Sequence, residues 1–346
     1  MSSPRAISIV GGGLAGLSLG CALRRSGIPT TIFEAGDYPR HRVCGEFIAG
    51  LRDRTIAQLG LADVLADALP CQSVRWFRAG RLIRRQTLSR PARAISRYSL
   101  DQRMAEAFVA AGGELRTHSR ISSSTTEEGR VFSSGRVRRE SEWIGLKVHA
   151  RGLVLESDLE FHLGDRCYVG LCALPDGSIN ICGLFQVRSG VSTSRTSALF
   201  SYLDAVGLGS LAAKLRSADC DEASFSAVAG FSFDLPANDD GADSPLSLGD
   251  AYAMIPPFTG NGMAIAFQSA ETALPHLIAW AKGETSWPQT MRVTKEALQK
   301  RFGRRFFLAS KLHPFLFHPP RQAVFNLVNR ARLLPLEVIS SAIHAH

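Results

Sequence analysis

One segment limits the folds open to this chain more than any other: AISIVGGGLAGLSLGCALRRSGIPTTIFEA, which starts at Ala6. Ala6–Val10 has the continuous apolar character of a buried strand, and Leu14–Ser26 repeats apolar residues at helical spacing. Thr30–Phe33 is rich in β-branched residues and predicts a second strand. Parallel strands need a crossover of this kind, so the segment predicts a β-α-β unit and an α/β fold.

Three glycines in this segment form the pattern G-x-G-x-x-G between the first strand and the helix. Gly11 permits a tight turn, Gly13 lets the backbone approach a pyrophosphate, and Gly16 lets helix and strand pack closely. Glu34 ends the second strand, where its carboxylate can accept hydrogen bonds from ribose hydroxyls and disfavours a 2′-phosphate. The segment therefore predicts a site for FAD or NAD. The contacts expected here are Gly11, Gly13, Leu14, Ala15, Gly16, Glu34 and Ala35.

The composition is that of a globular protein with room for a second domain. The chain has 346 residues, of which 45% are hydrophobic and 21% charged. No run of about 18 apolar residues occurs, which predicts no transmembrane helix. Met1 to Arg5 leaves no room for a signal peptide, so we expect a cytoplasmic location. The 7 cysteines form no CxxC pair and predict reduced thiols without a metal site.

The formal net charge of +9 raises the question of an anionic partner. The basic residues are mostly arginines, and eight of them lie between Arg75 and Arg97. No nucleic-acid-binding motif accompanies them, so we expect no nucleic acid. A positive surface of this kind favours anionic cofactors, acidic lipid or an acidic partner.

The middle of the chain predicts a sheet of a different type. Val74–Thr87 alternates around Ala79-Gly80 and predicts an antiparallel hairpin. Short strands follow between Trp143 and Gln186, with a turn at Pro175-Asp176-Gly177, and together predict an antiparallel sheet. Further helices are predicted at Leu51–Leu65, Leu100–Ala111 and Ser194–Lys214 and in a tail from Thr294 onward that breaks at His313-Pro314 and at His318-Pro319-Pro320.

A second glycine motif lies far along the chain, in LGDAYAMIPPFTGNGMAIAFQSAE from Leu248 onward. Gly249-Asp250 is followed by a Pro-x-x-Gly-x-Gly pattern and a helix, and here the chain resembles the flavoprotein family of para-hydroxybenzoate hydroxylase. The resemblance implies that Asp250 binds the ribityl chain of FAD. It also places Pro257, Gly260, Asn261, Gly262 and Met263 beside the pyrimidine edge of the flavin. A helix N-terminus there would supply N–H donors to the negative charge of reduced flavin.

Four further stretches are similar to the geranylgeranyl reductase branch of that superfamily, which includes flavin monooxygenases that accompany type III polyketide synthases. They are YPRHRVCGE, IGLKVHARG, YVGLCALPDGSINICGLF and PPFTGNG. The resemblance covers most of residues 5–285 and implies cofactor contacts by Arg42, Cys44, Gly45, Glu46 and Arg97. The family's Asp-Gly fingerprint is replaced by Ser134-Gly135-Arg136, and the halogenase signature Trp-x-Trp-x-Ile-Pro is absent.

The resemblance implies an FAD enzyme with NADH or NADPH as reductant and a hydrophobic small-molecule substrate. The first hypothesis is a monooxygenase that hydroxylates an aromatic or polyketide-derived molecule through a flavin C4a-hydroperoxide. The alternatives are reduction of isoprenoid double bonds and a non-catalytic flavin-binding protein. No catalytic side chain is required, and the candidates are Cys44 and the histidines His149 and His162, which could orient a phenol. An apolar substrate wall is expected from Leu146, Val148, Tyr168, Leu171 and Phe185.

These inferences divide the chain into three parts. The fold prediction is a Rossmann-type FAD/NAD(P)-binding domain with an inserted antiparallel-sheet substrate domain and a C-terminal helical segment. The C-terminal segment is apolar and basic, so it packs on the FAD domain or forms a lid or a peripheral membrane platform. The oligomeric state stays open. The predicted bounds are 1–73, 91–140 and 244–285 for the FAD domain, 74–90 and 141–235 for the substrate domain, and 286–346 for the tail.

Overall fold

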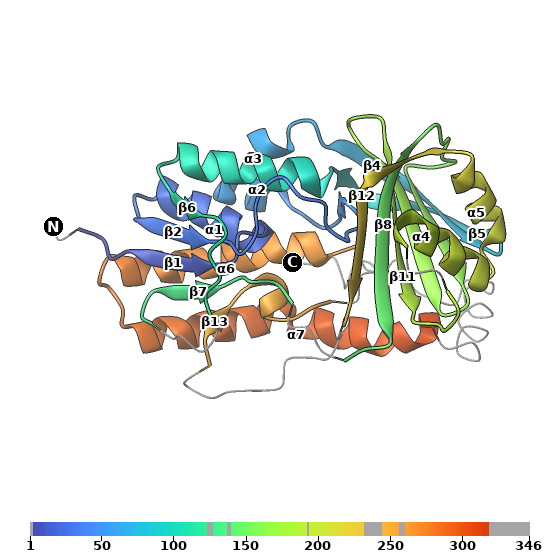
Figure 1. Ribbon diagram of the computed structural model, residues 1–346. Coiled ribbons are helices and arrows are strands. Elements are labelled where there is room, and N and C mark those ends of the chain that lie inside the picture. Colours follow the sequence, from blue (N-terminus) through green and yellow to red (C-terminus); the bar gives the residue numbers. More distant parts are fainter. Residues whose placement is uncertain are drawn as a thin grey trace.

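Two sheets form the framework of the chain. The computed structural model describes residues 3–122, 127–136, 140–191, 194–231, 244–255 and 260–317, with side chains up to residue 310. One sheet has five strands and the other has eight, and Figure 1 shows them side by side with the long helix α7 running below both. The predicted Rossmann-type α/β fold with a second, sheet-based part is confirmed.

The five-stranded sheet is parallel and has the order β13-β7-β1-β2-β6. Helix α1 (Leu14–Arg25) connects β1 to β2, which confirms the predicted β-α-β unit. The strands of this sheet are β1 (Ile7–Val10), β2 (Thr30–Phe33), β6 (Glu114–Arg116), β7 (Arg130–Phe132) and β13 (Leu246–Ser247).

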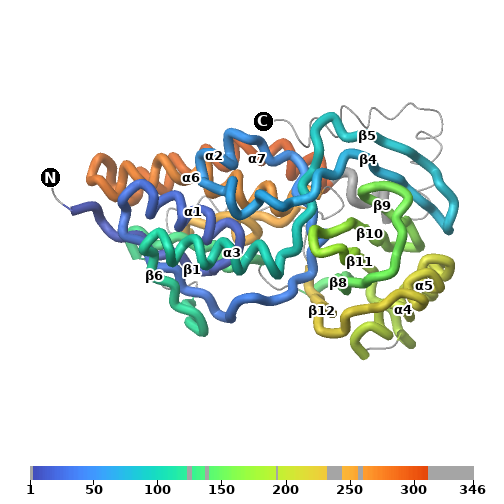
Figure 2. Tube along the Cα trace, turned by 90° about the horizontal axis from the view of Figure 1, so that it is seen from above, coloured from blue at the N-terminus to red at the C-terminus, as the bar shows by residue number. Residues whose placement is uncertain are grey.

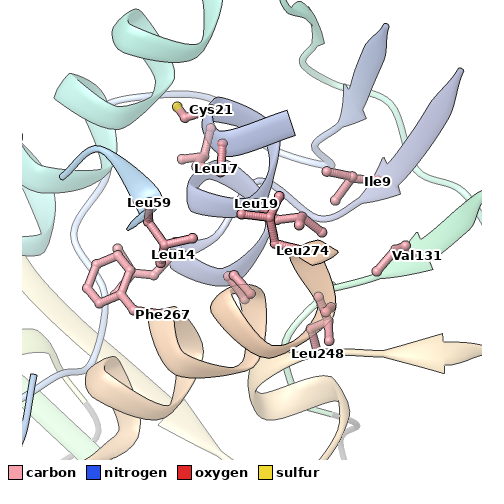
Figure 3. Close-up of a cluster of buried hydrophobic side chains, with 14 of the residues drawn as sticks. Ile9, Leu14, Leu17, Leu19, Cys21, Leu59, Val131, Leu248, Phe267 and Leu274 are labelled. Carbon is pink, nitrogen blue, oxygen red and sulfur yellow. The ribbon is translucent and has the colours of Figure 1, made fainter. Parts of the chain in front are cut away.

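Helix α1 is buried on all sides, as expected for a helix that is apolar around its whole circumference. Figure 3 shows Leu14 of α1 next to Phe267 of α6, while Ile9 and Val131 of the sheet lie further away, beyond Leu19 and Leu274. Helix α6 therefore packs on the start of α1. The helices of this part are α2 (Asp53–Leu59), α3 (Arg97–Ala110), α6 (Gly262–Ala281) and α7 (Trp287–Phe317), with short 3₁₀ turns η1 (Asp63–Leu65) and η2 (Gly249–Ala251).

The eight-stranded sheet has the order β12-β8-β11-β10-β9-β4-β5-β3. The strands between Trp143 and Gln186 are β8, β11, β10 and β9, and they pair antiparallel as predicted. Among the pairs of this sheet in the described residues, only β4 and β9 are parallel. The hairpin turn at Ala79-Gly80 is confirmed, because Arg78 pairs with Arg81 across it. The strands are β3 (Phe47–Ile48), β4 (Leu69–Arg78), β5 (Arg81–Ala94), β8 (Trp143–Arg151), β9 (Leu159–Gly164), β10 (Cys167–Ala173), β11 (Ile179–Gln186) and β12 (Asp219–Ala229).

Helices α4 (Arg195–Ala205) and α5 (Gly209–Arg216) cover the apolar face of this sheet. Four residues of the predicted substrate wall belong to that covered face, namely Leu146, Val148, Leu171 and Phe185. They are core residues, and the prediction is wrong for them because strands put alternate side chains on opposite faces. Only Tyr168 lies on the other face.

Two predicted helices are shorter than expected because a glycine with positive φ interrupts each. The helix predicted at Leu51–Leu65 ends before Gly60, whose φ is 68°. The helix predicted at Ser194–Lys214 is divided in two near Gly207, whose φ is 78°. The predicted break at His313-Pro314 is wrong, because α7 continues to Phe317. The predicted break at His318-Pro319-Pro320 lies outside the described residues. In the described ranges, every helix is too short or too polar to span a bilayer.

Candidate functional site

The glycine loop between β1 and α1 is shaped by close backbone packing. Gly11 has a φ of +106°, and a Cβ there would come within 2.4 Å of the Ser133 carbonyl oxygen. A Cβ on Gly16 would come within 2.0 Å of the Gly11 carbonyl oxygen, so helix and loop touch at this point. A Cβ on Gly13 would meet nothing within 4 Å. Gly13 thus adjoins open space at the N-terminus of α1, where N–H groups favour an anion.

Glu34 follows β2 and folds back onto this loop. Its Oε2 accepts from the Gly12 amide at 2.8 Å, and its Oε1 accepts from the Gly36 amide at 2.9 Å and from Arg40 at 2.6 Å. Burial opposes ionisation, but the Gly36 amide, Arg40 and the Gly12 amide hold the pKa of Glu34 below its usual value. The charged carboxylate keeps spare acceptor capacity, and its contact with a ribose stays a prediction.

The residue that follows β7 packs against the glycine loop. Ser133 donates its hydroxyl hydrogen to the Gly11 carbonyl at 2.7 Å, and its amide donates to the Val10 carbonyl at 2.7 Å. Arg136, two positions after Ser134, donates to the Gly230 carbonyl at 2.8 Å and lies over the Phe231 ring. Ser133 therefore anchors the glycine loop. Arg136, in the segment that replaces the Asp-Gly fingerprint, contacts the residues that directly follow β12 of the second sheet.

Gly249 and Asp250 lie next to the start of α1. A Cβ on Gly249 would come within 3.1 Å of the Ala15 Cβ, and the Gly249 amide donates to Ser269 Oγ at 3.0 Å. Asp250 can be reached by solvent, yet desolvation by the surrounding protein raises its pKa against the opposing charges of Arg97 and Arg136. Two motifs more than 200 residues apart in the sequence thus meet at one place.

Helix α6 begins at Gly262 and presents a second N-terminus to this region. Asn261 is its N-cap without a side-chain capping bond, and a Cβ on Gly262 would meet nothing within 4 Å. Gly260 has a φ of +66°, and a Cβ there would come within 2.4 Å of the Phe47 ring. The start of α6 therefore packs on β3 and, among the residues that the structure describes, leaves open space at its first residue.

Arg42 and Arg97 share one buried carboxylate. Asp101 Oδ2 accepts from Arg42 Nε at 2.9 Å and from Arg97 Nη2 at 2.8 Å, and its Oδ1 accepts from Arg97 Nε at 2.7 Å. Burial alone would lower the pKa of Arg97, but the charge of Asp101 raises it. Asp101 is fully buried, so it fixes both arginines near the start of α3.

The segment Cys44-Gly45 lies against the second sheet. Asn180 Nδ2 donates to the Cys44 carbonyl at 3.0 Å, and Cys172 Sγ donates to the Gly45 carbonyl at 3.2 Å. The Oδ1 atom of Asn180 is buried and has no hydrogen-bond partner among the described residues. Burial raises the pKa of the Cys44 thiol despite the charge of Arg97. Cys44 therefore stays protonated at neutral pH, which does not favour a nucleophilic role.

A buried ionic cluster around Glu46 joins strand β8 of the second sheet to the start of α3. His149 Nε2 donates to Glu46 Oε2 at 2.6 Å, and the Arg97 amide donates to Glu46 Oε1 at 2.9 Å. Lys147 Nζ lies 3.5 Å from Glu46 Oε1 and 3.0 Å from His41 Nδ1. Glu46 and Lys147 are both fully buried, so the charges of the cluster compensate each other inside the protein.

The cluster shifts the titration of its members. Burial opposes the charge of Glu46, but the His149 hydrogen bond and the Lys147 charge lower its pKa. Burial lowers the pKa of Lys147, and the Glu46 carboxylate offsets part of that effect. Burial and then the Lys147 charge lower the pKa of His41 to about 4. His41 is therefore neutral at pH 7 and can accept a hydrogen bond from Lys147.

The predicted site residues thus fall into two groups. The structure packs Gly249, the neighbour of Asp250, on Ala15 of α1 and Ala266 of α6, and it places His149 in the cluster around Glu46. His162 is separate, because it bonds Glu160 at 3.0 Å and stacks on Phe77. Of the remaining predicted contacts, Leu14, Ala15 and Met263 are buried, Ala35 is exposed, and Pro257 lies outside the described residues.

Sequence reasoning missed Lys147, Asn180 and Asp101. The sequence did carry a signal for Lys147. Lys147 and His149 are polar residues at alternate positions of an otherwise apolar strand, so their side chains share a face. Asp101, on a predicted helix, carried no comparable signal.

Comparison with known proteins supports the same architecture. A family profile described as NAD(P)-binding Rossmann-like domain matches residues 9–44. No curated protein sequence matches significantly.

The likeness to solved structures extends over nearly the whole chain. PqsL, a probable FAD-dependent monooxygenase from Pseudomonas aeruginosa, is 16% identical with a TM-score of 0.71, covering 92% of this chain and 99% of that one. p-Nitrophenol 4-monooxygenase PnpA from Pseudomonas putida DLL-E4 is 13% identical with a TM-score of 0.74, covering 99% and 97%. The flavin-dependent brominase Bmp2 is 16% identical with a TM-score of 0.73, covering 99% and 94%. This chain therefore has the fold of these flavin enzymes.

Proposed function

We propose that this chain is an FAD-dependent monooxygenase that hydroxylates a hydrophobic aromatic molecule, with NADH or NADPH as reductant. The observation that carries the proposal is the packing of α1 on α6 with open space, among the described residues, at the N-terminus of each helix. Gly13, the N-cap of α1, and Gly262, the first residue of α6, both adjoin this space, and Gly249 links the helices by packing on Ala15 and Ala266. A dinucleotide in which a ribityl chain links the diphosphate to a flavin ring matches this arrangement, with the diphosphate at the start of α1 and the ring at the start of α6.

The residues of the site fit FAD in their chemistry. The start of α1 would hold the diphosphate, the Glu34 carboxylate would accept from the adenosine ribose, and Asp250 would accept from the ribityl hydroxyls. The start of α6 would donate to the pyrimidine edge of the ring. Bound flavin would supply the activation of O₂, which protein side chains cannot provide. Arg97, fixed by Asp101, lies close enough to act electrostatically on Asp250, so it would add positive charge near the ribityl chain.

His149 is the candidate for handling the substrate proton. Because Glu46 accepts from Nε2, that nitrogen carries a hydrogen, and in the neutral imidazole Nδ1 is then the acceptor. No described residue forms a hydrogen bond with Nδ1. We infer that His149 accepts the proton of a phenolic hydroxyl, which activates the ring for hydroxylation, while Glu46 holds the imidazole in place.

The comparisons bear on the choice between reactions. Two solved structures of this fold are named as monooxygenases, which favours hydroxylation over reduction of isoprenoid double bonds. The branch that contains geranylgeranyl reductase is not named in the matches reported above. The resemblance of residues 38–46 and 144–185 to that branch keeps prenyl reduction as the second candidate.

The decisive experiment is mass spectrometry of products formed from alkylphenols under ¹⁸O₂, with purified protein, FAD and NADH or NADPH. We expect one ¹⁸O atom per product molecule and reductant oxidation that the phenol stimulates. Gain of two hydrogens by a geranylgeranyl compound without O₂ would instead establish the reductase. Bound FAD without turnover under any reductant would identify a non-catalytic flavoprotein.

The chain offers a matched control for the proton-handling role. His149→Gln is expected to lower kcat about 100-fold and to remove the pH dependence that the base confers. His162→Gln alters a similarly buried histidine bonded to Glu160 and should leave both unchanged. Equal losses in the two variants would refute the role of His149.

A further inference from the structure

The arginine-rich stretch found in the sequence forms an exposed β-ribbon that the proposed reaction does not use. Strands β4 and β5 pair along most of their length, and Figure 2 shows them at the end of the molecule away from the N-terminus. Strand β5 contacts β3 only through Arg93 and Ala94. From Arg81 to Ala92, its outer edge therefore has no partner strand among the described residues.

Like charges lie directly opposite each other in this ribbon. Arg75 pairs with Arg85, and Arg78 pairs with Arg81, as cross-strand neighbours. Directly opposed like charges destabilise a sheet. Arg75 is neutralised by an ion pair with Glu156. The positive charge that remains exposed on this ribbon therefore lies mainly on strand β5.

Three arginines of β5 are available to an anion. Arg81, Arg85 and Arg90 are exposed, and none has an ion-pair or hydrogen-bond partner among the described residues. Guanidinium groups bind phosphate through paired, parallel hydrogen bonds. Arginines spaced along an extended edge suit a flat array of phosphate groups better than a single small anion.

An apolar pair lies beside the first of these arginines. Leu82 is 38% exposed and Ile83 is 40% exposed, immediately after the hairpin turn. Among the large apolar residues exposed in the described ranges, they form the only pair adjacent in sequence. Basic side chains next to exposed aliphatic ones are the combination that binds an anionic bilayer, where both charge and shallow insertion contribute.

We propose that the β4–β5 hairpin docks this protein on the surface of an anionic phospholipid bilayer. Arg81, Arg85 and Arg90 bind lipid phosphates, and Leu82 and Ile83 enter the headgroup region. A nucleic acid would satisfy the arginines but would leave the apolar pair in water, so the bilayer is favoured. This inference does not depend on the proposed reaction, since docking can be measured without turnover.

The test is sedimentation of the purified full chain with vesicles. An equimolar mixture of phosphatidylcholine and phosphatidylglycerol is expected to bind the protein, and phosphatidylcholine alone is not. Binding should weaken as salt is added, because screening acts on exposed charges. Each arginine near a charged bilayer contributes about fivefold in partitioning, so Arg81→Gln/Arg85→Gln/Arg90→Gln should lose about 100-fold. Leu82→Ser/Ile83→Ser should lose about tenfold and become more sensitive to salt.

A matched variant separates local docking from net charge. Arg25→Gln/Arg54→Gln/Arg120→Gln removes the same charge from exposed positions on the first domain and should bind almost as the wild type does. Circular dichroism and the thermal midpoint establish that each variant is folded. The proposal is overturned if the two triple variants bind alike, if uncharged vesicles bind equally well, or if inorganic phosphate or duplex DNA displaces the protein from anionic vesicles at low concentration.

Discussion

The sharpest test of the site is a single methyl group placed at Gly13. Its φ of −85° and ψ of −173° are open to any residue, and a Cβ there would meet nothing within 4 Å. Gly13→Ala should therefore change the free energy of unfolding of the apoprotein by less than about 1 kcal/mol, since the loss of a good N-cap and the stiffer unfolded chain nearly cancel.

The same methyl group would stand where the diphosphate has to approach the start of α1. Hydrogen bonds to charged groups contribute about 1.5 kcal/mol or more each, so losing two of them costs about 3 kcal/mol. That value corresponds to a weakening of FAD binding by about 150-fold. Without FAD, the variant should thus be as stable as the wild type. When FAD is added, the wild type gains stability through binding, and the variant should gain less.

Gly16→Ala is the matched control, because its methyl group would meet protein instead of ligand. The added Cβ would lie 2.0 Å from the Gly11 carbonyl oxygen and 2.5 Å from Ser133 Oγ, so the helix has to shift. We expect a loss of about 2–3 kcal/mol in the unfolding of the apoprotein.

The assays are urea unfolding without FAD and titration of the apoprotein with FAD, followed by flavin fluorescence. If Gly13→Ala binds FAD within about threefold of the wild type, the dinucleotide does not approach this helix and the placement is wrong. If Gly13→Ala destabilises the apoprotein as much as Gly16→Ala does, the open space at Gly13 does not exist.

Three further predictions concern the buried charges. Glu46→Gln should lower the free energy of unfolding by about 3 kcal/mol, since it leaves Lys147 buried without its counter-charge, and adding Lys147→Met should restore at least half of the loss in urea unfolding. The pKa of His41 is about 4 in the folded chain and 6.5 in the reference state, so its contribution to stability is present above pH 6.5 and is lost as the pH falls toward 4. His41→Asn should therefore flatten the decline in stability over that range by about 1 kcal/mol, less than full linkage because the ring is partly exposed, and an unchanged slope would contradict this assignment. Asp101→Asn should cost about 3 kcal/mol, because Arg97 loses a fully buried partner, and a thermal midpoint equal to that of the wild type would count against the shared carboxylate.

The local features of the fold could be predicted from the sequence because their determinants are close together in the chain. The β-α-β unit depends on apolar spacing within Ile7–Phe33, and the turn at Ala79-Gly80 depends on two residues that adopt positive φ. The convergence of Gly249 with Ala15 was predicted through resemblance and not through periodicity.

The arrangement of the second sheet could not be predicted in the same way. Alternation in IGLKVHARG separates Leu146 and Val148 from Lys147 and His149, but it does not reveal which face meets the first domain. The apolar side was expected to form the substrate wall, and it packs under α4 and α5 instead. The contact between Glu46 and His149 joins residues 103 positions apart, so it follows from strand register and domain packing, which local sequence does not encode.

The register of the three central strands has a consequence for the substrate. On the face turned to the first domain, His149 lies opposite Asn180, which lies opposite Cys172, and this row is polar. Four residues further along the strands, beyond the row of Lys147, Cys182 and Gly170, the row that contains Leu184 and Tyr168 is apolar and buried. A ligand on this face would therefore meet hydrogen-bonding groups at one end and aliphatic and aromatic groups at the other. A phenol with a hydrophobic substituent satisfies both ends, whereas an isoprenoid chain would leave the Asn180 oxygen and His149 Nδ1 without partners at a desolvation cost of about 1–3 kcal/mol each. This asymmetry is the physical reason to prefer the aromatic substrate over the prenyl one.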